Sequence, residues 1–312
     1  MFPHSQLLAA ALLLWSVIAY PLACSAAVPK LVYKFPNTTY GGGIENIGVT
    51  SSGHLLLNAN KAPRTYIIDP HVACPTASLV ATFPDASSCL GIAEVASNTF
   101  AIVAGNYTST FEGVAGSFAI WLLDITNSKH PETKLLTKIP EAQALNGVTK
   151  LSGSSDLILV ADSGLGAVWS VDIKTGHYEQ AISSQLFTST AEIPLGINGL
   201  HTVNNNLYFT NTAQGFFGKV NITKEGKASG PVSKIAENIA GDDYDDFAFD
   251  KYGNAFIANH PNAISGITRS GQQYTVANVT GPTSAVFAKD TRANGVLYVP
   301  TIEGHVYAID IY

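Results

Sequence analysis

Leu145-Asn146-Gly147-Val148 is followed by the apolar run Asp156-Leu157-Ile158-Leu159-Val160-Ala161-Asp162 and then by Ala167-Val168-Trp169-Ser170-Val171-Asp172. About fifty residues later, Ile197-Asn198-Gly199-Leu200 precedes Asn206-Leu207-Tyr208-Phe209-Thr210-Asn211 and Gly218-Lys219-Val220. Self-similarity with a period of about 40–50 residues and several short strands per repeat predicts a β-propeller.

Four further repeats extend this pattern in both directions. The six repeats begin at or near Glu45, Leu90, Asn146, Asn198, Asp245 and Thr283. Each contains strand-like runs separated by Gly, Asn and Asp turns, and no helical pattern intervenes, which favours an all-β architecture. Six repeats predict six blades of about four strands each.

The last repeat predicts how the ring closes. The chain ends at Tyr312, directly after the third strand of repeat six, so that this blade lacks an outer strand. Leu31-Val32-Tyr33-Lys34-Phe35 has strand composition and precedes the first repeat. We expect it to complete the last blade, which removes an unpaired strand edge.

The prediction is a single all-β domain over residues 28–312, a six-bladed β-propeller closed by an N-terminal strand. The longest insertion, Gly105 to Ser117, is expected to form a loop over one face.

The composition limits the class of protein. The chain has 312 residues, of which 46% are hydrophobic and 13% charged, with a net charge of −6. It can bury a large core, and without a basic run nucleic acid is not an expected partner.

The N-terminus has the features of a signal peptide. Residues 7–19 are apolar and Ser25-Ala26-Ala27 offers a cleavage site, so residues 1–27 are interpreted as a signal peptide, with a signal anchor as the alternative. No later segment is long enough to span a bilayer. We expect a secreted or vesicular protein of the secretory pathway; the sequence leaves its oligomeric state open.

Cysteines and sequons agree with secretion. Cleavage would remove Cys24 and leave Cys74 and Cys89 on either side of a short loop, where a disulfide is expected, the alternative being two free buried thiols. Glycosylation sequons begin at Asn37, Asn106, Asn221 and Asn278.

A ring of polar residues is the candidate functional site. The residue that opens the innermost strand of a blade faces the central channel, and these residues are Glu45, Leu90, Asn146, Asn198, Asp245 and Thr283. Two carboxylates and two amides supply oxygen ligands of the kind that Ca²⁺ prefers. No His and Cys constellation indicates Zn²⁺. The alternative is that Asn and Asp only stabilise the turns that enter the strands.

Other residues could contribute to this site. If Asp245 and Asp246 both reach the channel, one of them would have a raised pKa and act as an acid. Phe216 and Phe247 either line an apolar substrate pocket or belong to the core between blades. His201 and His260 lie near blade ends, where most such histidines are structural.

The repeats resemble the SMP-30/gluconolactonase/paraoxonase superfamily. Asn146-Gly147-Val148 with Leu159-Val160-Ala161-Asp162-Ser163-Gly164 is similar to its third-blade pattern. Glu45 occupies the place of its metal-binding glutamate, and Asp245, ahead of Phe249-Asp250 and Gly253-Asn254, that of its aspartate. The resemblance implies lactone or ester hydrolysis assisted by Ca²⁺ or Zn²⁺, with Glu45, Asn146, Asn198 and Asp245 as metal ligands. The chain departs from this family at Asp246, where Gly is usual, and at Leu90, where a substrate motif is missing.

A second resemblance lies within the fungal branch. The segments Pro194-Leu195-Gly196-Ile197-Asn198-Gly199-Leu200, Leu207 to Thr212, Asp245 to Asp250 and Gly281-Pro282-Thr283-Ser284-Ala285 resemble secreted propellers that include the hetero-Diels–Alderases of tropolone sesquiterpenoid pathways. This implies that a quinone methide, derived from a tropolone or polyketide, adds to an alkene of humulene or a similar terpene, without a redox cofactor.

This resemblance also implies roles for the ring residues. Asp245, Asp246, Asn146 and Asn198 would bind the tropolone oxygens, one of them as an acid that assists loss of water. Glu45, Thr283, Phe247 and Phe216 would contact the substrates. The cyclase is our prediction and a Ca²⁺-dependent lactonase or esterase the alternative; a non-enzymatic binding propeller is the third class, because fold alone does not fix function.

Overall fold

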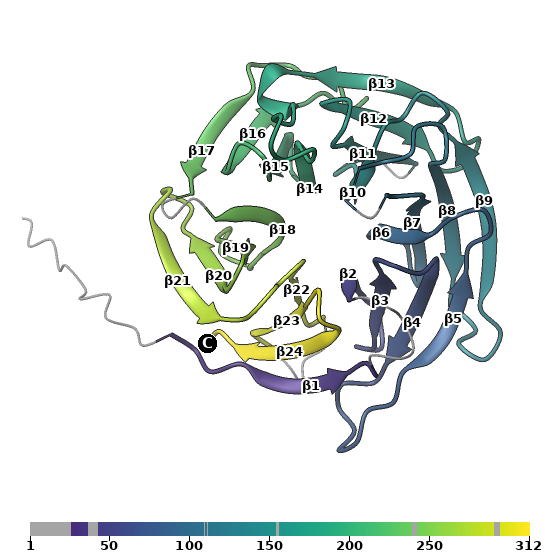
Figure 1. The fold of residues 1–312 in the computed structure, drawn as a ribbon, viewed down its shortest axis with the longest axis vertical. Helices are drawn as coiled ribbons and strands as arrows, with labels where there is room; N and C mark the ends of the chain where they lie inside the picture. The colour runs from purple at the N-terminus through teal and green to yellow at the C-terminus, as the bar shows by residue number, and fades with distance from the viewer. Residues whose placement is uncertain are drawn as a thin grey trace, which may run out of the picture.

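The structure is a computed structural model that describes residues 26–36, 43–108, 110, 112–153, 156–238, 242–289 and 294–312. These residues form six four-stranded antiparallel sheets arranged as blades around one axis (Figure 1). The predicted six-bladed, all-β propeller is therefore confirmed. The one helical element among them is the short 3-10 helix η1 (Gln185–Phe187). No helix in this described part is long and apolar enough to cross a membrane.

Each blade runs from its innermost to its outermost strand. Blade 1 contains β2 (Ile44–Val49), β3 (Leu55–Ala59), β4 (Arg64–Ile68) and β5 (Ser78–Thr82). Blade 2 contains β6 (Ser88–Ala96), β7 (Thr99–Gly105), β8 (Ala119–Asp124) and β9 (Glu132–Lys138). Blade 3 contains β10 (Leu145–Lys150), β11 (Leu157–Asp162), β12 (Ala167–Asp172) and β13 (Tyr178–Ser183).

The second half repeats this order. Blade 4 contains β14 (Ile197–Val203), β15 (Asn206–Asn211), β16 (Phe216–Asn221) and β17 (Ser233–Glu237). Blade 5 contains β18 (Asp243–Phe249), β19 (Ala255–His260), β20 (Ala263–Ile267) and β21 (Gln273–Asn278). Blade 6 contains β22 (Val286–Phe287), β23 (Val296–Pro300), β24 (His305–Asp310) and β1 (Lys30–Lys34).

The ring closes as the sequence predicts. Strand β1 pairs antiparallel with β24, and Lys30 lies opposite Ala308. The Lys30 ammonium donates to the Asp310 carboxylate at 2.7 Å across the same pair. One blade is thus built from both ends of the described chain, and β1 covers the edge of β24 that would otherwise be unpaired.

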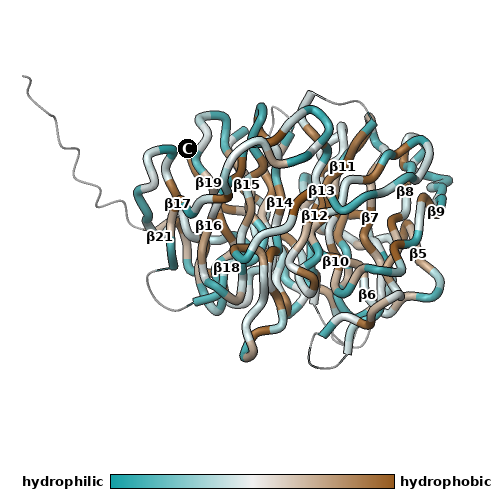
Figure 2. Tube along the Cα trace, turned by 90° about the horizontal axis from the view of Figure 1, so that it is seen from above, coloured by the Kyte–Doolittle hydropathy of each residue, from teal (hydrophilic) through white to brown (hydrophobic). Residues whose placement is uncertain are grey.

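The core lies between neighbouring blades. The second strand of a blade is covered on both faces, so its sequence is a continuous apolar run, as in Leu55-Leu56-Leu57 of β3. Leu56 of blade 1 packs with Phe100 and Ile102 of blade 2 in one such layer. Figure 2 shows the apolar residues along the strands and the polar residues in the turns. Each fully buried aliphatic side chain of this kind contributes about 1.5–3 kcal/mol, so the layers fix the blades and hence the channel.

A repeated turn joins strands at the rim. In Thr50-Ser51-Ser52-Gly53-His54, the Thr50 hydroxyl accepts the His54 N–H at 3.0 Å, and Gly53 has a φ of 86°. Asp250 with Gly253, and Thr268 with Gly271, form the same turn, with Gly φ angles of 85° and 87°. The pattern Thr/Asp-x-x-Gly therefore marks turns whose fourth residue needs a left-handed backbone.

The predicted disulfide between Cys74 and Cys89 is wrong. Both cysteines are free: Cys74 is exposed in the β4–β5 connection and Cys89 is buried in β6. The sequence suggested that both flank one loop, but Cys89 lies inside a strand and packs against Leu56, Phe83 and Phe100 between blades 1 and 2. Burial raises the pKa of the Cys89 thiol.

The sequons differ in their surroundings. Asn221 and Asn278 are exposed at the ends of β16 and β21. Asn106 is partly buried and its amide donates to the Asp85 carbonyl at 3.3 Å. Asn37, the predicted signal peptide up to residue 25 and Cys24 lie outside the described residues. Glycosylation and the domain boundary near residue 28 stay predictions.

Candidate functional site

The innermost strands are irregular where they meet the axis. In blades 1 to 5 the pairing of the first two strands shifts register near the start of the inner strand, for example between Leu145 and Val148 in β10 and between Ile197 and Leu200 in β14. Such bulges redirect side chains and are common beside functional sites. Here they bring two successive residues per blade to the axis.

We call these two sets of residues the first ring and the second ring. The first ring contains Glu45, Leu90, Asn146, Asn198, Asp245 and Thr283. The second ring contains Asn46, Gly91, Gly147, Gly199, Asp246 and Ser284.

Glycines let three blades approach each other in the second ring. A Cβ on Gly91 would lie 2.4 Å from the Asn146 carbonyl oxygen, and one on Gly147 would lie 2.3 Å from that of Asn198. A Cβ on Gly199 would lie 2.3 Å from the Asp246 carboxylate. Cβ atoms do not approach other atoms so closely, so this half of the ring has room for glycine alone.

Hydrogen bonds close the other half of the second ring. The Asp246 carboxylate accepts from the Asn46 amide at 2.9 Å, from the Ser284 hydroxyl at 3.0 Å and from the Phe247 N–H at 2.8 Å. His201 Nε2 lies 3.6 Å from the same carboxylate. This side opens on a hollow of about 220 Å³. The sequence placed Asp246 among the catalytic groups; in the structure its oxygens are occupied by the protein's own donors.

Three residues of the first ring, Glu45, Leu90 and Asn146, line a much smaller cavity. A space of about 20 Å³ is lined by Glu45, Asn60, Ser88, Leu90, Tyr107, Asn146 and Leu195. A volume of this size holds about one water molecule or one oxygen-bearing group. The cavity can therefore hold a single polar atom of a ligand, and apolar side chains form part of its wall.

Glu45 has an unusual environment in this cavity. Desolvation raises the pKa of its carboxyl well above the usual value, and the nearby charges of Asp245 and Asp246 raise it further. A carboxyl in such surroundings favours its neutral form, which can donate a hydrogen bond.

Asn60 was not identified from the sequence. It follows β3, is 5% exposed, and lies beside Glu45, whose pKa it lowers slightly against the larger opposing effects. Among the described residues, neither its Nδ2 nor its Oδ1 has a partner with hydrogen-bonding geometry. An unpaired buried amide costs about 1–3 kcal/mol, so the position is suited to a group that enters from outside. The inner-strand pattern gave no signal for it because Asn60 belongs to the end of a second strand.

Asp245 and Asn198 form a separate polar group. Asp245 Oδ2 lies 3.2 Å from His260 Nε2. Burial raises the pKa of Asp245, while His260 and the Asn198 amide oppose the shift. Burial lowers the pKa of His260, but Asp245 and Asp243 raise it more, so that the net shift is upward. Asn198 also donates to the Thr212 hydroxyl at 2.9 Å. His260, a minor candidate in the sequence, is thus the direct partner of Asp245.

The remaining predicted residues lie elsewhere. The Thr283 hydroxyl donates to the Ile44 carbonyl at 2.8 Å and joins blade 6 to blade 1. Phe216 and Phe247 are fully buried between blades, Phe216 against Phe209 and Phe247 against Phe217. Neither phenylalanine lines the cavity at Glu45.

The donors of the first ring are of the type that a hard cation binds. Glu45, Asn146, Asn198 and Asp245 offer carboxylate and amide oxygens. Asp245 and Asn198 already have protein partners, so a cation would replace those contacts. Within the described ranges, no group of three or more His, Cys, Asp or Glu side chains has a metal-binding arrangement.

Known proteins resemble this chain in sequence. "Putative hetero-Diels-Alderase" of a Phoma species is 26% identical over 303 residues, which cover 86% of this chain and 85% of the relative. "Putative hetero-Diels-Alderase asR5" of Sarocladium schorii is also 26% identical, over 90% of this chain and 83% of the relative. The chain resembles hetero-Diels–Alderases along most of its length. No protein-family model matches it.

Solved propellers share the fold at lower identity. Regucalcin from Agrobacterium tumefaciens, described as a calcium-binding protein, has a TM-score of 0.67 at 13% identity and covers 92% of this chain and 94% of its own. A luciferin-regenerating enzyme has a TM-score of 0.64 at 13% identity, over 90% of this chain and 95% of its own. A streptogramin B lyase has a TM-score of 0.56 at 14% identity, and the match covers 86% of this chain and 94% of the lyase. These structures show that the chain shares its propeller fold with proteins of different activities.

Proposed function

We propose that this protein is a hetero-Diels–Alderase that joins a quinone methide, derived from a tropolone or polyketide, to an alkene of a terpene such as humulene. The observation that carries the proposal is the similarity to two relatives of that name over 86% and 90% of the chain. The cavity of the first ring supports it, because it offers polar contacts for one oxygen and apolar contacts beside them.

The size of the cavity determines how substrates would sit. A space of about 20 Å³ accommodates an oxygen of the quinone methide but not a terpene. The carbon skeletons would therefore lie above it, against Leu90, Leu195 and Tyr107. Tyr107 is held in place because its hydroxyl donates to the Leu145 carbonyl at 2.8 Å. This arrangement would hold the two reactants together and exclude water.

The chemistry needs a donor at one oxygen. In the cycloaddition a C–C and a C–O σ bond form between the four-atom C=C–C=O unit and the alkene. The π bonds of the C=C, the C=O and the alkene are lost, one new C=C forms within the former four-atom unit, and no atom, proton or electron leaves. The C=C–C=O unit is the electron-poor partner, so its oxygen gains negative charge from the alkene in the transition state, and a fixed hydrogen-bond donor there stabilises that state. Asn60 Nδ2 is a buried donor beside the Glu45 carboxyl and has no partner with hydrogen-bonding geometry among the described residues. We assign it this role, and we expect no requirement for a redox cofactor because no electrons are transferred to or from the substrates.

The test is a direct incubation. Purified protein is mixed with a quinone-methide precursor and humulene, and the cycloadducts are quantified by chromatography against an enzyme-free control. We expect faster formation and one favoured stereoisomer. Rates and product ratios equal to those of the control would contradict the proposal.

A Ca²⁺-dependent lactonase is the second candidate. It is favoured by the positions of Glu45, Asn146, Asn198 and Asp245 and by the likeness to regucalcin. This reading requires saturable Ca²⁺ binding and lactone hydrolysis that is lost with EDTA. Cycloaddition that persists in EDTA, without lactone hydrolysis, would exclude it.

We further propose that the protein enters the secretory pathway. The exposed positions of Asn221 and Asn278 support this. After expression in a fungal host, a glycosidase should increase gel mobility, and Asn221→Gln with Asn278→Gln should abolish much of that shift. Retention of an uncleaved, unglycosylated chain in the cytosol would contradict it.

A further inference from the structure

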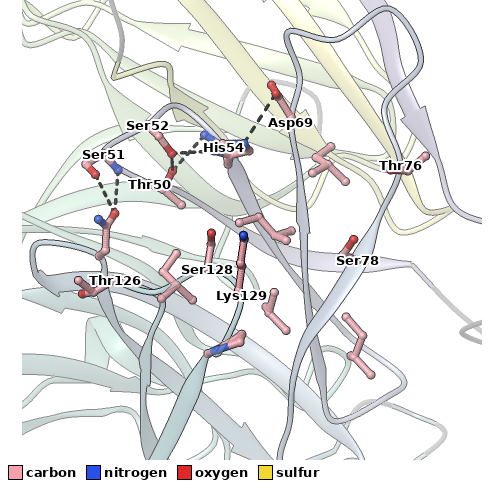
Figure 3. A pocket seen from close by; sticks show the side chains of 17 residues that line it. Thr50, Ser51, Ser52, His54, Asp69, Thr76, Ser78, Thr126, Ser128 and Lys129 are labelled. Carbon is pink, nitrogen blue, oxygen red and sulfur yellow. Dashed lines mark hydrogen bonds and ion pairs between the residues drawn. The ribbon is translucent and has the colours of Figure 1, made fainter.

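A larger pocket lies at the other end of blades 1 and 2. It is formed by the β2–β3 turn, the β4–β5 connection and the β8–β9 connection, and has a volume of about 590 Å³ (Figure 3). Glu45 is near the start of β2 and this turn follows its end, about 17 Å away at the usual rise of a strand. Ligand pockets commonly have volumes of about 300–1,000 Å³. The pocket is thus separate from the first ring and large enough for a small molecule.

Hydroxyl groups from both blades face this pocket. Ser52, Thr76 and Ser78 come from blade 1, and Thr126 and Ser128 come from blade 2 (Figure 3). These hydroxyls can both donate and accept hydrogen bonds. They suit a ligand that carries several hydroxyl groups of its own.

The two charged groups, Lys129 and Asp69, occupy different parts of the pocket. Lys129 extends toward its centre beside Ser128 (Figure 3), and it is absent from the ion pairs among the described residues. Asp69 is turned toward His54, with 3.7 Å between Asp69 Oδ2 and His54 Nε2. The other nitrogen of His54, Nδ1, lies 2.6 Å from the Ser52 hydroxyl. Lys129 would therefore attract an anionic group of a ligand, whereas Asp69 would repel it. The Asp69 carboxylate can instead accept a hydrogen bond from a ligand hydroxyl.

The wall and the turn complete the site. Ile67, Leu79 and Ile125 line the pocket and provide apolar contact for a carbon skeleton. The turn that presents Ser52 and His54 is fixed by the Thr50 hydroxyl, which accepts the His54 N–H. The position of this turn is thus set before a ligand binds.

We propose that this pocket binds a polyhydroxylated carboxylate, such as a sugar acid, with its carboxylate at Lys129 and Ser128 and its hydroxyls toward Ser52 and Asp69. The inference is independent of the cyclase activity, because the pocket shares no residue with the cavity at Glu45.

The experiment is a binding titration of the full chain with galacturonate, its neutral counterpart galactose and inorganic phosphate. We expect saturable binding of galacturonate, at least about tenfold stronger than that of galactose or phosphate. Lys129→Ala should reduce galacturonate binding about tenfold or more, whereas Lys129→Arg should retain most of it. A charge-assisted hydrogen bond has this magnitude.

The control is Lys134→Ala, which removes an exposed lysine of β9 outside the pocket and should leave binding unchanged. Cycloaddition should be unaffected by Lys129→Ala. Absence of saturable galacturonate binding, equal binding of galactose, binding of phosphate as tight as that of galacturonate, or an unchanged affinity in Lys129→Ala would each overturn the proposal.

Discussion

The first and second rings lie side by side on the same inner strands, yet Glu45 of the first ring and Asp246 of the second have opposite environments. In the second ring, Asp246 accepts three hydrogen bonds from groups of the protein. At the cavity lined by Glu45 of the first ring, Asn60 has no partner with hydrogen-bonding geometry among the described residues, and the pKa of Glu45 is strongly raised. A saturated network stabilises a fold, whereas unpaired buried groups are retained where a ligand can satisfy them. The comparison indicates that the second ring stabilises the channel, and it supports the proposal that the chemistry takes place at the cavity beside Glu45.

The largest effect is expected from Asp246→Ala. The substitution leaves the Asn46 amide, the Ser284 hydroxyl and the Phe247 N–H without their acceptor in a buried site. We expect a loss of about 3 kcal/mol in the free energy of unfolding, measured by denaturant titration. Asp243→Asn, at the partly exposed start of β18, is the control. A loss below about 1 kcal/mol would show that the network does not stabilise the channel.

Gly147→Ala tests the glycine half of the same ring. The new methyl group would lie 2.3 Å from the Asn198 carbonyl oxygen, so blades 3 and 4 would have to separate. Overpacking of this kind costs about 1–3 kcal/mol, which should appear as a lower melting temperature. Gly230→Ala, where the nearest atom is 3.5 Å away, should have little effect. Equal melting temperatures for both variants would contradict the close approach.

Asn60→Leu tests the cavity that Asn60 lines together with Glu45. Replacing the unpaired amide by an apolar group of similar size should preserve or raise stability. Removing the donor should lower the rate of cycloaddition about tenfold. The rate is measured with saturating substrates, and Asn205→Leu in an exposed turn is the control. Wild-type activity in Asn60→Leu would remove Asn60 from the mechanism.

Glu45→Gln has the smallest expected effect, and it depends on pH. In the metal-free protein the folded pKa of Glu45 lies above its unfolded value, which is about 4.3. Below the unfolded pKa the carboxyl is neutral in both states and imposes no cost. As the pH rises toward the folded pKa, the unfolded state ionises first and the wild type loses stability.

Glu45→Gln should therefore melt at the same temperature as the wild type near pH 4 and a few degrees higher near pH 8. The measurement is a series of melting curves in EDTA, with the exposed Glu132→Gln as the control. A variant that is less stable than the wild type at pH 8 would show that the Glu45 charge is favourable in the fold.

The fold was predictable because repetition and strand composition act over long segments. Six repeat starts and one unassigned strand before Glu45 were sufficient for the blade number and for the closure by β1. The convergence of Glu45, Asn146, Asn198 and Asp245 follows from propeller geometry. The roles of individual residues depend on bulges that shift the register by one position, and a bulge has no unique sequence signature.

Three residues show what the repeat pattern could not give. Asp246 is adjacent to Asp245, but the bulge directs it to the donors of the second ring. Asn60 lies at the end of a second strand, outside the set of strand starts that the repeats define. Cys89 lies inside a strand, and alternation of side chains buries it away from Cys74.

The pairing of β1 with β24 has a consequence for folding kinetics. Lys30 and Asp310, which meet in the closing blade, are 280 positions apart in the chain. Contacts between distant residues form late, because the entropy of closing so long a loop must be lost before the contact is gained. The five other blades can pair their strands locally as they leave the ribosome. The sixth must wait for its last strand, so an open ring with one incomplete blade is the species that we expect to accumulate during refolding.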